Sequence, residues 1–137
     1  MGDETGIYDA VGGDAPFHEL VEAFYRLVEA DRALRALYPD DLGPGKEHLA
    51  WFLIQRFGGP DHFNRRRGAP RLRARHSEFA ITPAMRDAWV RHMAAALGAV
   101  DAFAAHRDVM RVYFEDAATF LINRDVPAAT RTPLSTL

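Results

Sequence analysis

The sequence contains no cysteine, and Lys46 is its only lysine. The lack of cysteine excludes disulfide scaffolds, thiol catalysis, zinc fingers and cysteine-ligated iron–sulfur clusters, and it fits a reducing compartment. No apolar stretch approaches the roughly 18 residues of a membrane span, and the acidic first residues do not resemble a secretory signal. We therefore expect a cytoplasmic protein that has no membrane partner.

A strong excess of charge of one sign is also missing. The chain holds 17 basic and 19 acidic residues among its 137, which gives a formal net charge of −2. Because general binding to nucleic acid depends on positive charge, a chain so close to neutrality predicts no nucleic-acid partner. The length suits one domain, and we expect a single domain over 1–137 with flexible ends at 1–6 and 124–137.

Apolar residues recur at intervals of three and four in four long stretches, which is the period of a helix. The first begins near Pro16, with Asp14 placed to cap it, and a short helical stretch follows at 31–37. The second begins at Pro44, and the run Gly58-Gly59-Pro60 stops it.

The two remaining helices follow a less regular middle segment. The third begins with Thr82 as its cap and Pro83 in its first turn, and Gly98 closes it. The fourth covers about 106–122. Its residues expected to face inward are Val109, Val112, Tyr113, Ala117, Phe120 and Leu121. Because no segment has the period of a strand, the predicted fold class is all-α.

Residues 61–75 carry six arginines and few apolar positions, and we expect a loop with a turn or two of helix. Three interpretations of this arginine cluster stay open: a solvated loop, a contact surface for nucleic acid, or forked donors that anchor carboxylates or phosphates. The third gains support if a cofactor lies beside the cluster.

None of the six histidines has another three or four residues away, so no helix presents a paired metal site. A single axial histidine to haem iron needs no such spacing; it needs an apolar slot, an acceptor for its second nitrogen and cations near the propionates. His76 fits best, since three arginines precede it and Phe79 and Ile81 follow. The alternative is that His76 is a polar residue in a basic loop.

Three aromatic residues with polar atoms stand among the expected core residues: Tyr25, Tyr38 and Trp89. Burying their O–H and N–H groups costs free energy unless those groups find partners. Together with Phe24 and Phe52, they form either a hydrogen-bonded core or a polar pocket around a ligand.

An ordered set of motifs resembles the group II truncated haemoglobins over nearly the whole of 7–123. Each motif is weak alone, but their order and spacing are specific. The matching segments are Tyr8-Asp-Ala-Val-Gly-Gly13, Phe24-Tyr25, Tyr38-Pro39, Phe57-Gly58-Gly59-Pro60, Pro70-Arg-Leu-Arg-Ala-Arg-His76 with Phe79, and Asp87-Ala-Trp89. The resemblance implies a two-over-two helical sandwich, a shortened globin around haem b.

The resemblance also implies roles for single residues. It makes His76 the proximal ligand of a five-coordinate haem iron, and it places Tyr25, Tyr38 and Trp89 on the distal side as hydrogen-bond donors to O₂, CO or NO. Gly45 falls at the distal gate, where a missing side chain leaves an opening. Further residues expected at haem or ligand are Phe24, His48, Leu49, Phe52, Phe63, Leu72, Arg75, Phe79 and Ile81.

The contacts to the haem propionates depart from the family pattern. Arg75 is the first candidate to bind a propionate and His48 the second, because a basic side chain often reaches a propionate from that position. Phe63 stands where a tyrosine would bond a propionate, and Phe57 stands where a tryptophan is expected. A shift of its helix would also bring His48 to the iron from the distal side.

The leading hypothesis is a haem protein that binds diatomic gases and releases O₂ slowly. The family's redox reactions, among them oxidation of nitric oxide to nitrate, peroxidase-like chemistry and nitrite reduction, are candidate turnover. The alternatives are a dedicated haem peroxidase in the same pocket and a cofactor-free helical module. We assign no catalytic residue. Expected partners are the gases, an unidentified reductase and a second copy of the chain in a homodimer.

Overall fold

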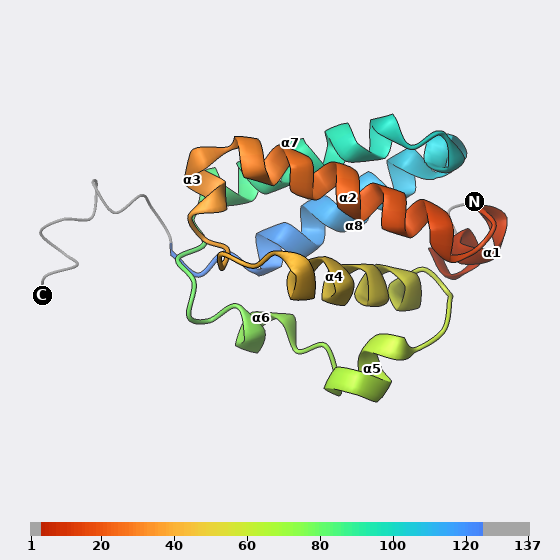
Figure 1. The fold of residues 1–137 in the computed structure, drawn as a ribbon, viewed down its shortest axis with the longest axis horizontal. Coiled ribbons are helices and arrows are strands. Elements are labelled where there is room, and N and C mark those ends of the chain that lie inside the picture. Colours follow the sequence, from red (N-terminus) through yellow and green to blue (C-terminus); the bar gives the residue numbers. More distant parts are fainter. Residues whose placement is uncertain (1–3, 125–137) are drawn as a thin grey trace, which may run out of the picture.

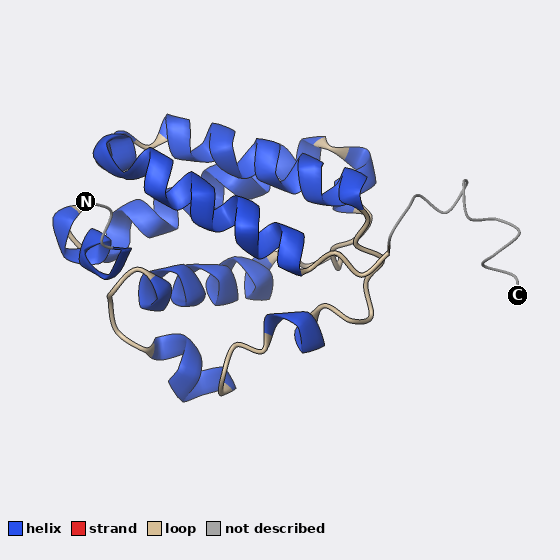
Figure 2. Ribbon diagram, turned by 180° about the vertical axis from the view of Figure 1, so that it is seen from behind, coloured by secondary structure: helices blue, strands red, loops and turns tan. Residues whose placement is uncertain are grey.

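In the computed structural model, residues 4–124 are described, and they form helices and no strand (Figure 2). The all-α prediction is therefore confirmed. Of the ends expected to be flexible, 1–3 and 125–137 lie outside the described residues, and 4–6 form η1. The elements are η1 (Glu4–Gly6), α1 (Ile7–Ala10), α2 (Asp14–Ala30), α3 (Arg32–Arg35), α4 (Gly43–Arg56), α5 (His62–Arg67), α6 (Leu72–Arg75), α7 (Pro83–Ala99), η2 (Asp101–His106) and α8 (Arg107–Phe120).

Four long helices form two antiparallel pairs, α2 with α4 and α7 with α8 (Figure 1). The pairs meet where α2 packs on α7. This is the two-over-two arrangement that the resemblance implies. The short helices α5 and α6 lie at the edge beyond α4 (Figure 1). Among residues 4–124, no helix is both long and apolar enough to span a membrane.

The apolar face predicted for the first long helix forms the centre of the core. Phe17, Leu20, Phe24 and Val28 of α2 are completely buried, and each such side chain contributes roughly 1.5–3 kcal/mol relative to exposure. The ring of Phe17 lies 5.1 Å from that of Phe103 in an edge-to-face contact. This contact packs η2 against α2.

Two predicted helix ends differ from the structure. Asp14 is the first residue of α2 rather than its cap, which is Gly13, and the hydroxyl of Tyr8 donates to the Asp14 carboxylate at 2.6 Å. Gly98 does not close the third helix, which continues to Ala99. The predicted cap at Thr82 is confirmed, since the amide of Met85 donates to its Oγ1 at 3.2 Å.

The inward face predicted for α8 is only partly correct, since Val109 and Tyr113 pack against the core. Met110, Phe114 and Ala118 are its buried residues, whereas Val112 and Phe120 are 49% and 57% exposed. The buried stripe is thus rotated by about one residue from the predicted one. Phe103 of the preceding turn η2 is completely buried against Phe17, and α8 packs against both η2 and α7.

Polar contacts position the turn after α3, which carries Tyr38. Asp31 caps α3 by accepting from the amide of Leu34, and Nε2–H of His92 on α7 donates to it at 2.8 Å. These hydrogen bonds hold the pKa of the Asp31 carboxyl below its usual value. The guanidinium of Arg35 donates to the carbonyls of Tyr38, Pro39 and Asp40 at 3.0–3.3 Å. The turn is therefore tied to both α3 and α7.

The amino-terminal turn packs against the end of α4 at Gly58. This glycine has a φ of +105°, and a Cβ atom there would lie only 1.8 Å from the carbonyl oxygen of Thr5. The amide of Tyr8 donates to the carbonyl of Phe57 at 2.9 Å, and Arg56 pairs with Glu4 at 2.6 Å. Only glycine satisfies both the backbone conformation and this close approach.

We expect Gly58→Ala to lower the free energy of unfolding by more than about 3 kcal/mol, because displacement of the Thr5 backbone adds to the conformational strain. Gly12→Ala is the matched control, since Gly12 has a similar φ of +92° but open space at its Cβ position. It should lose only the strain, about 1–3 kcal/mol. Urea unfolding of both variants measures the difference, and equal losses would contradict this account.

Candidate functional site

His76 directly follows α6 and has a fixed ring orientation. Its Nδ1 lies 2.7 Å from the carbonyl oxygen of Leu72, and because a carbonyl can only accept, Nδ1 carries the proton. Nε2 therefore presents its lone pair away from this contact, as an axial ligand to iron requires. The ring of Phe79 lies 6.4 Å away in an edge-to-face arrangement.

The chain after His76 is held by Asn123, a residue that the sequence analysis did not assign to the site. The Nδ2 of Asn123 donates to the carbonyl of His76 at 3.1 Å, and its Oδ1 accepts from the amide of Ile81 at 2.9 Å. No periodicity or motif marks an isolated asparagine at the end of a helix. The sequence therefore offered no signal for this role.

The three expected distal donors come together from three parts of the chain. Tyr25 of α2 is 4% exposed, and its ring meets that of Tyr38 edge to face at 5.7 Å. The Trp89 side chain of α7 hydrogen-bonds to the Tyr38 hydroxyl, and it packs 5.2 Å from the ring of Phe24. The structure therefore brings these donors into one group, and the apolar ring of Phe24 packs against it.

Both tyrosines of this group keep their protons at neutral pH. Burial raises the pKa of Tyr25 to about 12. Burial and the neighbouring Tyr25 raise the pKa of Tyr38 still further, although the hydrogen bond from Trp89 opposes that rise. Protonated hydroxyls remain hydrogen-bond donors, so the group can stabilise negative charge on a small ligand.

Gly45, in the first turn of α4, is needed for the position of Tyr25. A Cβ atom at Gly45 would lie 2.8 Å from the Tyr25 hydroxyl oxygen. The missing side chain therefore lets that hydroxyl approach the backbone of α4. Further along the same helix, Leu49 and Phe52 are half-buried, and the ring of Phe52 packs 5.7 Å from the buried ring of Phe63.

The two candidate propionate contacts, His48 and Arg75, lie together with a third basic residue, Arg67. Nη1 of Arg67 donates to Nε2 of His48 at 3.3 Å, and the guanidinium of Arg75 lies 5.3 Å from the ring centre of Phe63. Burial and the two arginines lower the pKa of His48, so this imidazole is neutral at pH 7. The resemblance to the family indicates His48 and Arg75 as propionate contacts, whereas the run of arginines conceals Arg67.

Arg75 also holds the loop before α6. Its Nε donates to the carbonyl of Pro70 at 2.6 Å, and its Nη2 donates to the carbonyls of Arg67 and Ala69 at 2.6 and 3.1 Å. Only Nη1 is not used in these contacts. Within 4–124, none of the six arginines of the cluster except Arg65 has a carboxylate within 4 Å.

The arrangement fits haem. One imidazole nitrogen is directed away from its own helix, and the core leaves five apolar side chains expected at haem half-buried or exposed: Leu49, Phe52, Leu72, Phe79 and Ile81. Cations for two carboxylates stand at one side. Within the described residues there is no cluster of three His, Cys, Asp or Glu side chains suited to a bare metal ion.

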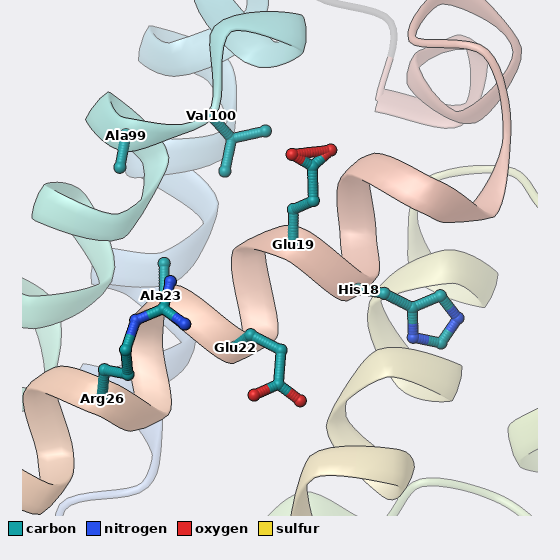
Figure 3. A pocket seen from close by; sticks show the side chains of 7 residues that line it. All are labelled: His18, Glu19, Glu22, Ala23, Arg26, Ala99 and Val100. Atoms are coloured by element: carbon teal, nitrogen blue, oxygen red, sulfur yellow. The ribbon is translucent and has the colours of Figure 1, made fainter.

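A shallow cavity elsewhere shares no residue with this site. Its volume is about 390 Å³, and it lies between α2 and the end of α7 (Figure 3). Its lining residues are His18, Glu19, Glu22, Ala23, Arg26, Ala99 and Val100. Glu19, Glu22 and Arg26 line it and it is open to solvent, so it does not resemble an enclosed slot for a cofactor.

Alkaline pH should test the burial of the two tyrosine hydroxyls. Their folded-state pKa values lie above the unfolded value near 10, so their contribution to stability is complete below pH 10 and declines as pH rises toward 12. Tyr25→Phe should make this decline shallower by about 1.4 kcal/mol per pH unit. Phe24→Leu, which removes no ionisable group, should leave the slope unchanged. Urea unfolding from pH 9 to 12 measures both slopes; an identical slope in wild type and Tyr25→Phe would refute the burial argument.

Comparisons with known proteins agree with this geometry. The profile of the family described as bacterial-like globin matches residues 6–123. Group 2 truncated hemoglobin YjbI of Bacillus subtilis (strain 168) is 32% identical over 117 residues, which cover 85% of this chain and 88% of that protein.

Solved structures are similar over almost the same range. The hemoglobin of the thermophilic phototrophic bacterium Chloroflexus aurantiacus is 52% identical with a TM-score of 0.83, covering 86% of this chain and 98% of that chain. The group II truncated hemoglobin of Bacillus anthracis is 31% identical with a TM-score of 0.83, covering 87% and 97%. The chain therefore belongs to the bacterial-like globins, as a group 2 truncated haemoglobin, a family of proteins that bind haem and diatomic gases.

Proposed function

We propose that the chain binds haem b through Nε2 of His76 and retains O₂, CO or NO beside Tyr25, Tyr38 and Trp89. When bound, haem would supply an iron that can coordinate the His76 imidazole and a diatomic gas. The observation that carries the proposal is the convergence of the three distal donors, because an ordinary apolar core has no need of it.

Trp89 contributes through Tyr38 rather than directly. The indole of Trp89 donates to the Tyr38 oxygen, so the Tyr38 proton is directed toward another acceptor. Tyr25 supplies a second hydroxyl beside it. Each hydrogen bond to a charged acceptor is worth roughly 1.5–3 kcal/mol, or about 10- to 100-fold in dissociation. Two such donors make release slow, which favours ligand sensing, scavenging or redox turnover over delivery.

The cationic side receives the propionates in this proposal. Arg67 stands beside His48, and Arg75 retains Nη1 beyond its loop contacts. Forked guanidinium donors match carboxylates well. The neutral His48 faces Arg67 rather than the distal donors, so it is poorly suited to be the acid–base group that a peroxidase needs. Gas binding is therefore favoured over peroxidase chemistry, and oxidation of nitric oxide to nitrate, supported by an unidentified reductase, is the proposed turnover.

His76→Ala should abolish normal iron ligation in protein reconstituted with haem. Wild type should show a five-coordinate ferrous spectrum with a distinct Soret band, because a single imidazole occupies the iron. His18→Ala is the control, since His18 is exposed on α2 and should leave the spectrum unchanged. A His76→Ala protein with the wild-type ferrous spectrum would rule out the assignment.

Tyr25→Phe should accelerate O₂ dissociation by about 10- to 100-fold, because one charge-stabilising donor is lost. Trp89→Phe should accelerate it less, since this residue acts through Tyr38. CO carries less negative charge, so its dissociation should change little. Tyr113→Phe serves as control, because Tyr113 packs on Phe57 and Arg56, outside the donor group. Stopped-flow rates for Tyr25→Phe that equal those of wild type would contradict the proposed stabilisation.

A further inference from the structure

The helix that carries His76 is not fixed by the core. Helix α6 has four residues and none of them is buried, whereas α2 buries seven. Packing therefore cannot determine where the histidine lies. Its position depends on hydrogen bonds at the two ends of α6. At the first end, Arg75 donates to the carbonyls of Arg67, Ala69 and Pro70.

At the second end, the contacts come from Asn123, which follows α8. Its Nδ2 donates to the carbonyl of His76 at 3.1 Å, and its Oδ1 accepts from the amide of Ile81 at 2.9 Å. Its own amide donates to the carbonyl of Ile81 at 3.0 Å. In Figure 1 the end of α8 and the segment between α6 and α7 meet at this point.

The side-chain amide of Asn123 bridges the segment from His76 to Ile81, which links α6 to α7. The link already turns back on itself, because the amide of Phe79 donates to the His76 carbonyl at 3.1 Å. Asn123 then joins the first residue of the link to Ile81. The remainder of α8 is anchored in the core by Met110 and Phe114. A rigid helix is therefore connected directly to the backbone of the histidine.

Asparagine suits this role because one side chain supplies both a donor and an acceptor. Aspartate retains an acceptor for the Ile81 amide but has no donor at neutral pH for the His76 carbonyl. Alanine retains neither. The two hydrogen bonds can therefore be removed together or one at a time.

We propose that Asn123 is a positioning residue for His76, holding the backbone of the iron ligand at a fixed distance from the end of α8. The inference rests on the proposed function, since it takes His76 as the ligand. Arg75 secures the loop before α6 and Asn123 the link after it, and together they replace the packing that α6 lacks.

The test compares Asn123→Ala and Asn123→Asp with wild type and with Asn64→Ala. Asn64 is the control, because its side-chain oxygen accepts from Nε2 of Gln55 and its backbone amide donates to Oε1 of Gln55, which joins α5 to α4 far from His76. The first measurement is amide hydrogen exchange of Ile81 in the apoprotein. The second is the iron–histidine stretching frequency of the ferrous haem-loaded protein, by resonance Raman spectroscopy.

Asn123→Ala should increase exchange at Ile81 by about tenfold, the effect of losing a typical hydrogen bond, and should shift and broaden the iron–histidine mode. Asn123→Asp should keep exchange near wild type yet still shift the mode, because only the bond to His76 is lost. Asn64→Ala should change neither measurement.

An iron–histidine mode in Asn123→Ala identical to that of wild type would overturn the proposal, even if exchange at Ile81 increases, because Asn123 would then only brace the link. Unchanged exchange at Ile81 would overturn it as well. Absence of the mode from wild type would refute the proposed function and this inference together. That result is distinguishable, since exchange in the apoprotein would still differ between the variants.

Discussion

The buried face of α2 is the constraint on which the rest of the structure depends. It packs against α4 on one side and α7 on the other, so it fixes how the two helix pairs meet. The same face carries Tyr25, whose hydroxyl must reach the site without leaving the core. Gly45 makes this compatible, since any side chain there would displace the hydroxyl. The contact between α2 and α4 therefore determines both how these helices pack and where the Tyr25 hydroxyl lies.

The periodicity of the apolar residues was sufficient to predict the long helices and the all-α fold class. Thr82 and Pro83 mark the start of α7, because a capping hydroxyl and a proline in the first turn can be recognised from the local sequence. The face of α8 was predicted only in part, because its apolar residues occur on more than one side, among them the exposed Val112 and Phe120. Packing against α7 and η2 decides which side faces inward, and periodicity does not reveal those contacts.

The candidate site was predictable only in part. The resemblance indicated His76 and the three distal donors because they lie in recognisable motifs. It did not indicate the contacts that position them. Asn123 and His76 are 47 residues apart, and Asp31 and His92 are 61 apart. A polar pair of this kind has no preferred spacing, since the partners meet only after the fold has formed. Arg67 was missed for another reason, because five neighbouring arginines make its position indistinguishable.

The absence of buried residues in α6 also has a thermodynamic meaning. Segments with few apolar contacts open at a small fraction of the global unfolding free energy. By this criterion we expect the segment around His76 to open locally at a lower free energy than the helix pairs. A molecule that binds only the closed segment shifts this local equilibrium according to its concentration. The concentration of that molecule therefore sets how much of this segment is ordered, so that its binding and the local folding of the segment form one coupled equilibrium.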